Sequence, residues 1–169
     1  MNKFLVMVNA IALALIASAD TLDDACKLIK EHEGFESKVY VCPAGRKTIG
    51  YGFTDVKHIE KGRISRREAD EILRSRVQSE LNWVKSTFPK LDSKQQVAIA
   101  SLAYNIGHDK LCWKTVNGKR VHTNAYTALK AGNWKRAAHE ISEFRCSNGV
   151  VLKGLVKRRS AECKLLLHT

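Results

Sequence analysis

Residues 33–52 read EGFESKVYVCPAGRKTIGYG, and this run is the most informative part of the chain. Val39 and Val41 alternate with polar residues before the turn-forming residues 43–45, and Ile49 continues the alternation beyond them. Alternation on both sides of a Pro/Gly-containing turn predicts a β-hairpin. The chain should therefore contain a small β element in its first third.

A helix is expected directly before this hairpin. Thr21 with Asp24 three residues later is an N-cap signal. The helix should run from there to Glu33 and end at Gly34, because glycine is the usual residue just beyond a helix C-terminus. The expected buried stripe consists of apolar residues at helical spacing, namely Leu22, Ala25, Cys26, Leu28 and Ile29.

Everything after the hairpin is predicted to be helical. Two capping boxes, at residues 65–68 and 93–96, each open an apolar stripe of helical period. Shorter helices are expected over 124–131, 133–144 and 155–167. The predicted fold class is α+β, with a small β-hairpin lobe and a larger helical lobe.

Composition narrows the class of protein. The chain has 169 residues, of which 44% are hydrophobic and 27% charged, values that exclude a disordered, collagen-like or multi-span membrane protein. Its formal net charge is +12, which attracts polyanions such as nucleic acid, anionic membrane surfaces or acidic cell-wall polymers. No aromatic-interleaved basic stripe or nucleic-acid motif favours the first of these.

Residues 1–19 are predicted to be an export segment. A short positive start is followed by an apolar run from Phe4 to Ala19, interrupted at Asn9 and ending in an A-x-A pattern. Sixteen helical residues cover roughly 24 Å, which is marginal for a bilayer core of roughly 30 Å. Two alternatives stay open, a cleaved signal peptide or an anchor that can leave the membrane. Either one assigns 20–169 to a single exported domain.

Five scattered cysteines agree with export to an oxidising compartment. They have no metal-binding spacing, and their odd number leaves at least one thiol unpaired within the chain. Four of them could form two disulfides and one could stay free, and the sequence does not fix which. If Cys42 is the free thiol, the remaining four are candidates for structural or regulatory disulfides: Cys26, Cys112, Cys146 and Cys163.

Glu33 is the first candidate for catalysis. The negative end of the helix dipole and the apolar hairpin disfavour its ionised carboxylate, which suits a general acid. The facing hairpin supplies Cys42 and Thr48, each able to hold or activate a water. Gly50 and Gly52 predict a backbone that approaches this site closely.

These residues carry a resemblance. Eight residues separate Glu33 from Cys42 and five separate Cys42 from Thr48, and with the motif of residues 48–52 this is similar to the active-site region of T-even-type phage lysozymes. The similarity continues in SLAYNIG (101–107), AGNW (131–134) and GLVKRR (154–159), with Glu162. It therefore covers nearly all of 22–167.

The resemblance implies a lysozyme-like fold and hydrolysis of the β-1,4 bond between N-acetylmuramic acid and N-acetylglucosamine in peptidoglycan, causing lysis of a bacterial host. By resemblance, Glu33 would be the general acid and Thr48 would position the water. Cys42, at a position commonly Asp, would act as general base or as orienter of the water. The family's behaviour favours inversion at the anomeric carbon.

The resemblance also implies which residues bind substrate, which partners the protein has and where it acts. Tyr40, Gly52 and Asn105 would bind substrate. No cofactor or metal is expected. The expected partners are peptidoglycan and, transiently, the inner membrane through residues 4–19, with no nucleic acid. The protein is expected to be a monomer that reaches the host periplasm or is secreted after signal cleavage. Phe53 departs from a position that is often His in relatives, and 111–123 is longer and more polar than the usual connection.

Rival interpretations stay open. Cys42 is a departure that a non-catalytic peptidoglycan-binding module could tolerate, although Glu33 and Thr48 argue against that. The same fold could serve as a secreted antibacterial effector. If Cys42 is catalytic, a disulfide would block it, with Cys26 the nearest caging candidate in sequence. Repositioning of the helix that bears Glu33 is the other candidate switch.

Overall fold

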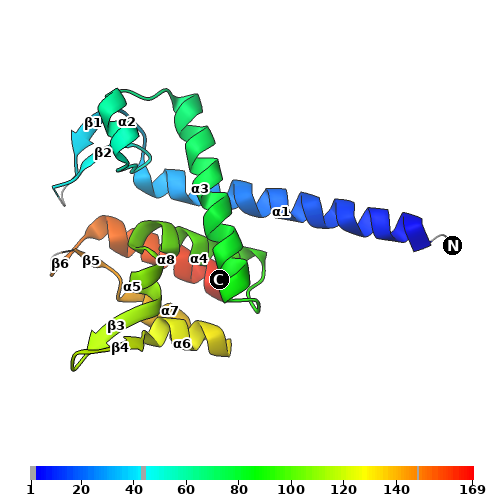
Figure 1. Ribbon diagram of the computed structural model, residues 1–169. Coiled ribbons are helices and arrows are strands. Elements are labelled where there is room, and N and C mark those ends of the chain that lie inside the picture. The colour runs from blue at the N-terminus through cyan, green and yellow to red at the C-terminus, as the bar shows by residue number, and fades with distance from the viewer. Residues whose placement is uncertain (1–2, 43–44, 148) are drawn as a thin grey trace.

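The computed structural model describes residues 3–42, 45–147 and 149–169 and has an α+β architecture (Figure 1). The elements in chain order are α1 (Lys3–Glu33), β1 (Glu36–Val41), β2 (Lys47–Gly50), α2 (Val56–Lys61), α3 (Arg66–Thr87), α4 (Ser93–Ile106), α5 (His108–Cys112), β3 (Trp113–Val116), β4 (Lys119–His122), α6 (Asn124–Ala131), α7 (Trp134–Ser142), β5 (Cys146–Ser147), β6 (Val150–Val151) and α8 (Lys153–Leu167).

Two lobes share the long helix α3 (Figure 1). One lobe holds the β1–β2 hairpin, α2 and the C-terminal end of α1. The other is built around α4, which packs against α8, α1 and α3. Every residue from Val97 to Ala103 is buried, because α4 has neighbours on all sides. The fold therefore brings α1, which ends beside the β1–β2 hairpin, against the central helix of the other lobe.

The predicted hairpin is confirmed. β1 and β2 are antiparallel, with Tyr40 opposite Thr48 and Val41 opposite Lys47. The Cys42 N–H donates to the carbonyl of Arg46 over 2.9 Å, which continues the pairing towards the turn. Residues 43 and 44 of the predicted turn lie outside the described residues.

The helices α3 and α4 each begin at an N-cap residue whose side chain accepts a hydrogen bond from a backbone N–H. Ser65 Oγ accepts from the N–H of Glu68 over 3.1 Å, as expected for the start of α3. The second capping box lies one residue earlier than predicted. Asp92 accepts from the N–H of Gln95 over 3.0 Å, and the side chain of Gln95 accepts from the N–H of Asp92 over 3.2 Å. Asp92 thus takes the capping role that the sequence pattern assigned to Ser93.

The predicted helix start near Thr21 is wrong, because α1 is continuous from Lys3 to Glu33. Residues 3–19 are rich in alanine, leucine and isoleucine and contain no glycine or proline, so nothing breaks the helix before the capping signal. The predicted boundary between 19 and 20 falls inside this helix. Among the described residues, no helix combines the length and apolar character needed to cross a membrane.

The prediction that everything after the first hairpin is helical is also wrong. Residues 113–122 form the antiparallel hairpin β3–β4, with Trp113 opposite His122, and β5 pairs with β6. Asn117 and Gly118 both have positive φ, 49° and 74°, at the turn of β3–β4. Asn-Gly is the preferred sequence for such a two-residue hairpin turn, so a signal was present in the sequence.

Candidate functional site

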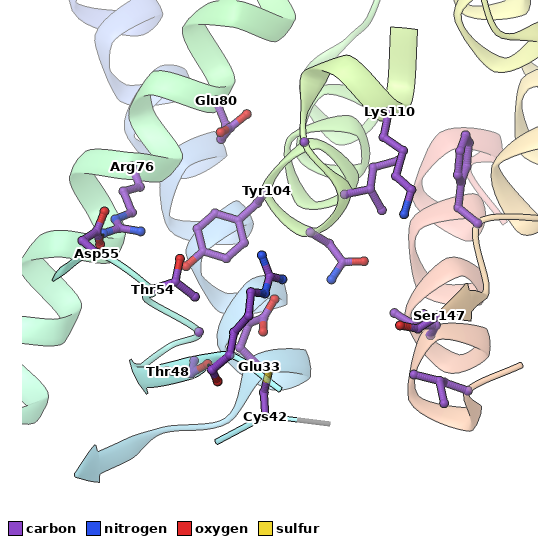
Figure 2. A pocket seen from close by; sticks show the side chains of 18 of the residues that line it. Glu33, Cys42, Thr48, Thr54, Asp55, Arg76, Glu80, Tyr104, Lys110 and Ser147 are labelled. Carbon is purple, nitrogen blue, oxygen red and sulfur yellow. Dashed lines mark hydrogen bonds and ion pairs between the residues drawn. The ribbon is translucent and has the colours of Figure 1, made fainter. Parts of the chain in front are cut away.

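A cleft of about 970 Å³ lies between the β1–β2 hairpin and the helical lobe. Figure 2 shows Glu33, Thr48 and Cys42 grouped on one side, with Lys110 and Ser147 on the other. The lining includes all six residues predicted as catalytic or substrate-binding, namely Glu33, Tyr40, Cys42, Thr48, Gly52 and Asn105. The fold thus gathers these residues at one site, while their roles stay predictions.

Glu33 is the last residue of α1, and the chain turns away at Gly34 with φ 69°. Its side chain is 21% exposed and its Oε1 accepts a hydrogen bond from Arg158 Nη1 over 2.5 Å. Arg158 comes from α8 and is almost completely buried. The sequence analysis did not predict a cation beside Glu33.

Gly52 lies directly against the Glu33 carboxylate. Its φ is 83°, and a Cβ built on its backbone would come within 3.0 Å of Glu33 Oε2. Only glycine adopts this conformation without strain and leaves the carboxylate its space. The close approach predicted from the glycine pattern is therefore an approach to Glu33.

Cys42 and Thr48 share one backbone acceptor, the carbonyl oxygen of Arg46. The Cys42 N–H donates to it over 2.9 Å and the hydroxyl of the buried Thr48 over 3.0 Å. Since a hydroxyl has one donor and two acceptor lone pairs, Thr48 Oγ1 retains the ability to accept a hydrogen bond from a water. The arrangement fixes the Thr48 hydroxyl at the cleft wall.

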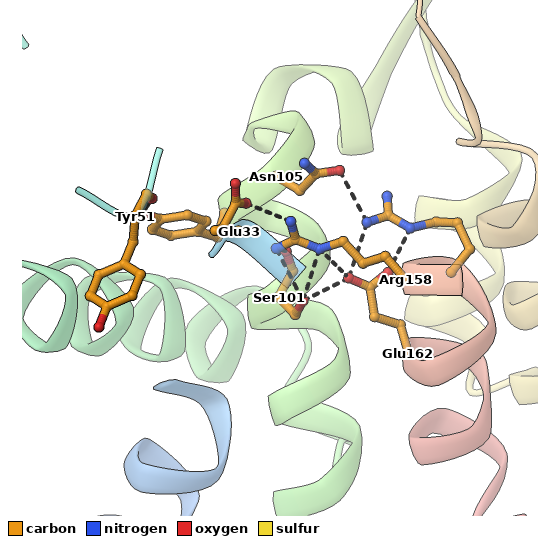
Figure 3. Close-up of polar contacts among 8 residues, drawn as sticks. Glu33, Tyr51, Ser101, Asn105, Arg158 and Glu162 are labelled. Carbon is orange, nitrogen blue, oxygen red and sulfur yellow. Dashed lines mark hydrogen bonds and ion pairs between the residues drawn. The ribbon is translucent and has the colours of Figure 1, made fainter. Parts of the chain in front are cut away.

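Glu33 contacts a network of buried charged side chains (Figure 3). Arg158 also donates to the backbone carbonyl of Ser101 over 3.1 Å and to Glu162 Oε1 over 3.2 Å. Burial raises the pKa of Glu162, and the two arginines oppose that shift. Because each charged member has an oppositely charged partner, the network avoids an uncompensated buried charge.

The same network orients Asn105. Arg159 pairs with Glu162 over 2.7 Å and donates to Asn105 Oδ1 over 3.1 Å. Arginine can only donate, so this contact identifies the oxygen of the Asn105 carboxamide and leaves its two N–H donors for other partners. Asn105 therefore offers the cleft a donor, which suits the predicted contact with substrate.

The sequence analysis missed two polar features of the cleft. Tyr104 donates from its hydroxyl to the carbonyl of Tyr51 over 2.8 Å, and burial raises the pKa of Tyr104 well above its ordinary value. Arg76 forms an ion pair with Asp55 and lies 4.5 Å from the ring centroid of Phe53. Phe53 thus contacts a cation through its ring, at the position that the sequence analysis expects to depart from the family pattern. No local pattern signals these contacts between distant segments.

The cysteines have different environments. Cys26 and Cys112 are buried free thiols with pKa values raised by that burial, and burial raises the pKa of Cys163 to about 11. A raised pKa lowers the thiolate fraction and with it the reactivity of a thiol. Cys146 is exposed and lines the cleft, as Cys42 does. The predicted pairing of Cys26, Cys112, Cys146 and Cys163 stays a prediction.

Comparisons with known proteins agree with this geometry. The family model described as phage lysozyme matches residues 30–162. The chain is 35% identical over 150 residues to the SAR-endolysin of Haemophilus phage HP1, covering 85% of this chain and 78% of that protein.

Solved structures are similar as well. The active form of P1 phage endolysin Lyz superposes with a TM-score of 0.74 at 27% identity, covering 86% of this chain and 83% of that one. The muramidase domain of SpmX from Asticcacaulis excentricus gives a TM-score of 0.67 at 26% identity, covering 85% and 94%. The similarity spans both lobes and the cleft between them.

Proposed function

The chain belongs to the phage lysozyme family and is a glycosidase that hydrolyses bacterial peptidoglycan as an endolysin, and we propose how its residues divide this work. In this proposal Glu33 is the general acid that protonates the glycosidic oxygen between N-acetylmuramic acid and N-acetylglucosamine. Thr48 and Cys42 hold the attacking water. The carrying observation is that a helix-end carboxylate, a fixed hydroxyl and a thiol line one cleft.

Arg158 supports the role of Glu33 as an acid that must give up its proton. When the proton moves to the leaving oxygen, Glu33 becomes a carboxylate 2.5 Å from a guanidinium. The guanidinium then stabilises charge that develops along the reaction, which lowers the barrier more than it stabilises the starting state. Arg158 also holds the carboxyl group in one orientation.

The water is assigned to the opposite side of the sugar. Thr48 Oγ1, with its proton engaged by Arg46, accepts one hydrogen bond from the water and so directs the water's lone pair towards the anomeric carbon. Cys42 accepts the other proton as a thiolate, or orients the water as a thiol. Attack from this side predicts inversion, which NMR of the first-formed anomer would detect.

The test is reducing-sugar release from purified peptidoglycan by the full chain. Glu33→Gln should abolish release, because glutamine cannot donate the proton, whereas Glu31→Gln should retain it. Glu31 is the matched control, since it is exposed on the same last turn of α1. Loss of activity in Cys42→Ser, and reversible loss on oxidation of the wild type, would assign the thiol to the reaction.

Full activity of Glu33→Gln would overturn the assignment of Glu33. Wall binding without release under any redox condition would instead favour the non-catalytic module. If the enzyme is exported and hydrolyses peptidoglycan, but phage lysis proceeds equally well without it, the antibacterial effector would be favoured.

Kinship with SAR-endolysins indicates that the chain acts outside the bacterial cytoplasm. We further propose that residues 4–19 associate transiently with the inner membrane before the enzyme reaches the periplasm. The continuity of α1 supports a coupling, because one helix contains both this segment and Glu33. Withdrawal of the segment from the membrane would then move the helix that bears the proposed acid.

Asn9→Leu tests the membrane step. Removing the polar interruption should raise the share of protein in the membrane fraction and delay lysis, because leucine favours the bilayer core. Asn82→Leu, an exchange of the same kind on the exposed face of α3, should change neither. Equal fractionation of all three proteins would contradict the proposal.

A further inference from the structure

The turn that carries Gly52 is held at its two ends by the main chain. The N–H of Ile49 donates to the carbonyl of Phe53 over 2.9 Å, and the N–H of Phe53 donates to the carbonyl of Ile49 over 2.8 Å. Between these residues, Gly50 and Gly52 have positive φ, 65° and 83°. Glycine has more backbone freedom than any other residue, so this turn needs an anchor at its central residue, Tyr51.

Tyr51 is anchored by helices of both lobes. Its side chain is buried, and its hydroxyl donates to Asp70 Oδ1 of α3 over 2.8 Å. Its carbonyl oxygen accepts a hydrogen bond from the hydroxyl of Tyr104 on α4, also over 2.8 Å. Lys30 Nζ of α1 lies 5.5 Å from the centroid of the Tyr51 ring. The contact from Tyr104 reaches the main chain of the turn, directly before Gly52.

The hydrogen bond from Tyr104 acts on the peptide unit beside Glu33. A peptide unit is planar, so a donor that fixes the Tyr51 carbonyl also fixes the Cα of Gly52. A Cβ built on that atom would come within 3.0 Å of Glu33 Oε2. In Figure 2 the Tyr104 side chain extends from α4 towards the side of the cleft that holds Glu33. The turn thus forms a wall against one oxygen of the carboxylate, while Arg158 binds the other.

The surroundings of Tyr104 suit it to this contact. Its side chain is half-buried, and burial, followed by the nearby charge of Glu33, raises the pKa of Tyr104 well above its ordinary value. The hydroxyl therefore keeps its proton and remains a donor throughout the neutral pH range. Loss of this donor would leave the carbonyl of the buried Tyr51 without its partner, which favours rearrangement of the glycine-flanked turn.

We propose that Tyr104 is a positioning residue for the hydrolysis, an inference that rests on the proposed function. Its hydroxyl holds the peptide unit between Tyr51 and Gly52, and this unit keeps the carboxyl group of Glu33 in the orientation from which it protonates the glycosidic oxygen. Tyr104 acts through the turn and not on the sugar. Because Tyr104 belongs to the helical lobe and Gly52 to the hairpin lobe, both lobes together place the proposed acid.

Direct binding of substrate by Tyr104 is the competing explanation, because this residue also lines the cleft. The two roles differ in their kinetics. Loss of a residue that only binds substrate raises KM and leaves kcat intact, whereas misplacement of the acid lowers kcat. The proton of the Tyr104 hydroxyl is already donated to the Tyr51 carbonyl, which favours the role through the turn.

The first test is steady-state kinetics of Tyr104→Phe in the full chain on purified peptidoglycan. This exchange removes the hydroxyl and keeps the ring, so kcat should fall about tenfold while KM stays within about twofold of the wild-type value. Tyr126→Phe is the matched control and should retain kcat, because Tyr126 is also half-buried in the helical lobe but lies outside the cleft. Urea unfolding of all three proteins establishes that each is folded under the assay conditions.

A double-variant cycle tests whether Tyr104 acts through Gly52. Gly52→Ala alone should impair catalysis, because its methyl group meets the carboxylate of Glu33. In the variant that combines Tyr104→Phe with Gly52→Ala, the two losses in kcat should not multiply, since a loosened turn lets the methyl group move away from Glu33. Losses that multiply would mean that the two residues act independently, which would overturn the proposal.

NMR follows the turn directly, even where turnover is too slow to measure. The Gly52 N–H belongs to the same peptide unit as the Tyr51 carbonyl, so its signal should shift and broaden in Tyr104→Phe and stay in place in Tyr126→Phe. An unchanged Gly52 signal in Tyr104→Phe would contradict the proposal.

The kinetic outcomes separate this inference from the proposed function. A wild-type protein that releases no reducing sugar would contradict the proposed function itself. An active wild type together with a Tyr104→Phe variant of equal kcat, whether or not its KM is raised, would overturn the positioning role of Tyr104 and leave the proposed function intact.

Discussion

At the scale of single residues, the site depends on how closely atoms of other residues approach Glu33. One oxygen of its carboxylate accepts from Arg158, and the other lies where a side chain on Gly52 would begin. The acid is thus held between a cation and a glycine. Position 52 is therefore expected to tolerate substitution as poorly as the proposed catalytic positions do.

Gly52→Ala should lower kcat by about 10- to 100-fold, because the new methyl group displaces the Glu33 carboxylate from its place. It should also reduce the free energy of unfolding by about 1–2 kcal/mol, the cost of a left-handed conformation in a residue with a Cβ. Reducing-sugar kinetics and urea unfolding measure the two effects.

Gly62→Ala is the control for that variant. Gly62 has φ 74°, and a Cβ there would meet nothing within 4 Å. It should lose similar stability and retain full activity. Equal kinetics of the two variants would show that the space beside Glu33 does not limit catalysis.

At the scale of elements, α1 is held on α3 by polar contacts between their surfaces. Asp23 pairs with Arg74, Lys30 lies 2.6 Å from Asp70, and the hydroxyl of Tyr51 donates to Asp70 over 2.8 Å. Asp70 therefore links the helix that ends at Glu33 to the loop that carries Gly52.

The contact with Lys30 holds the pKa of Asp70 below its ordinary value, with help from Tyr51. A lowered folded-state pKa stabilises the protein above the unfolded-state value of about 3.9, and this stability is lost as the pH falls through the lower folded-state value. Asp70→Asn should reduce the free energy of unfolding at pH 7 by less than about 1 kcal/mol, because the pair is more than a third exposed.

At pH 2 the wild type and Asp70→Asn should have the same free energy of unfolding in urea titrations. Glu71→Gln is the control, since Glu71 is exposed and lies 3.6 Å from Arg67 on the same helix. A stability difference for Asp70→Asn that persists unchanged at pH 2 would refute the link to ionisation.

At the scale of the whole molecule, the net charge is expected to aid the encounter with the anionic cell wall. The chain carries 29 Lys and Arg against 17 Asp and Glu, and within 20–55 the acids outnumber the bases. The excess positive charge therefore belongs to residues 56–169, which include the helical lobe. A positive lobe attracts an anionic polymer before specific contacts form.

KM for intact cell wall should rise several-fold from low to high NaCl, while kcat changes little, because salt screens charges separated by more than about 10 Å at 0.1 M. Steady-state kinetics across a salt series provide the measurement. Unfolding temperatures over the same series separate screening from a loss of stability. A KM independent of salt would exclude long-range attraction as a factor in wall binding.

Local signals in the sequence determined the hairpin, the end of a helix at Glu33 and the spacing to Cys42 and Thr48. These features depend on residues close in the chain, whose alternation, turns and caps act over a few positions. The predictions for the start of α1 and for residues 113–122 were wrong because two local signals competed. At the start of α1, the N-cap signal at Thr21 competed with the helix-forming apolar run before it.

Tertiary structure alone decided what surrounds the proposed acid. Arg158 is 125 residues from Glu33, and their contact depends on how α8 packs against α4 and how α1 ends beside both. The orientation of Asn105 by Arg159 has the same origin. Spacing in the sequence carries no information about such contacts, because they form only when whole helices bury their faces against one another.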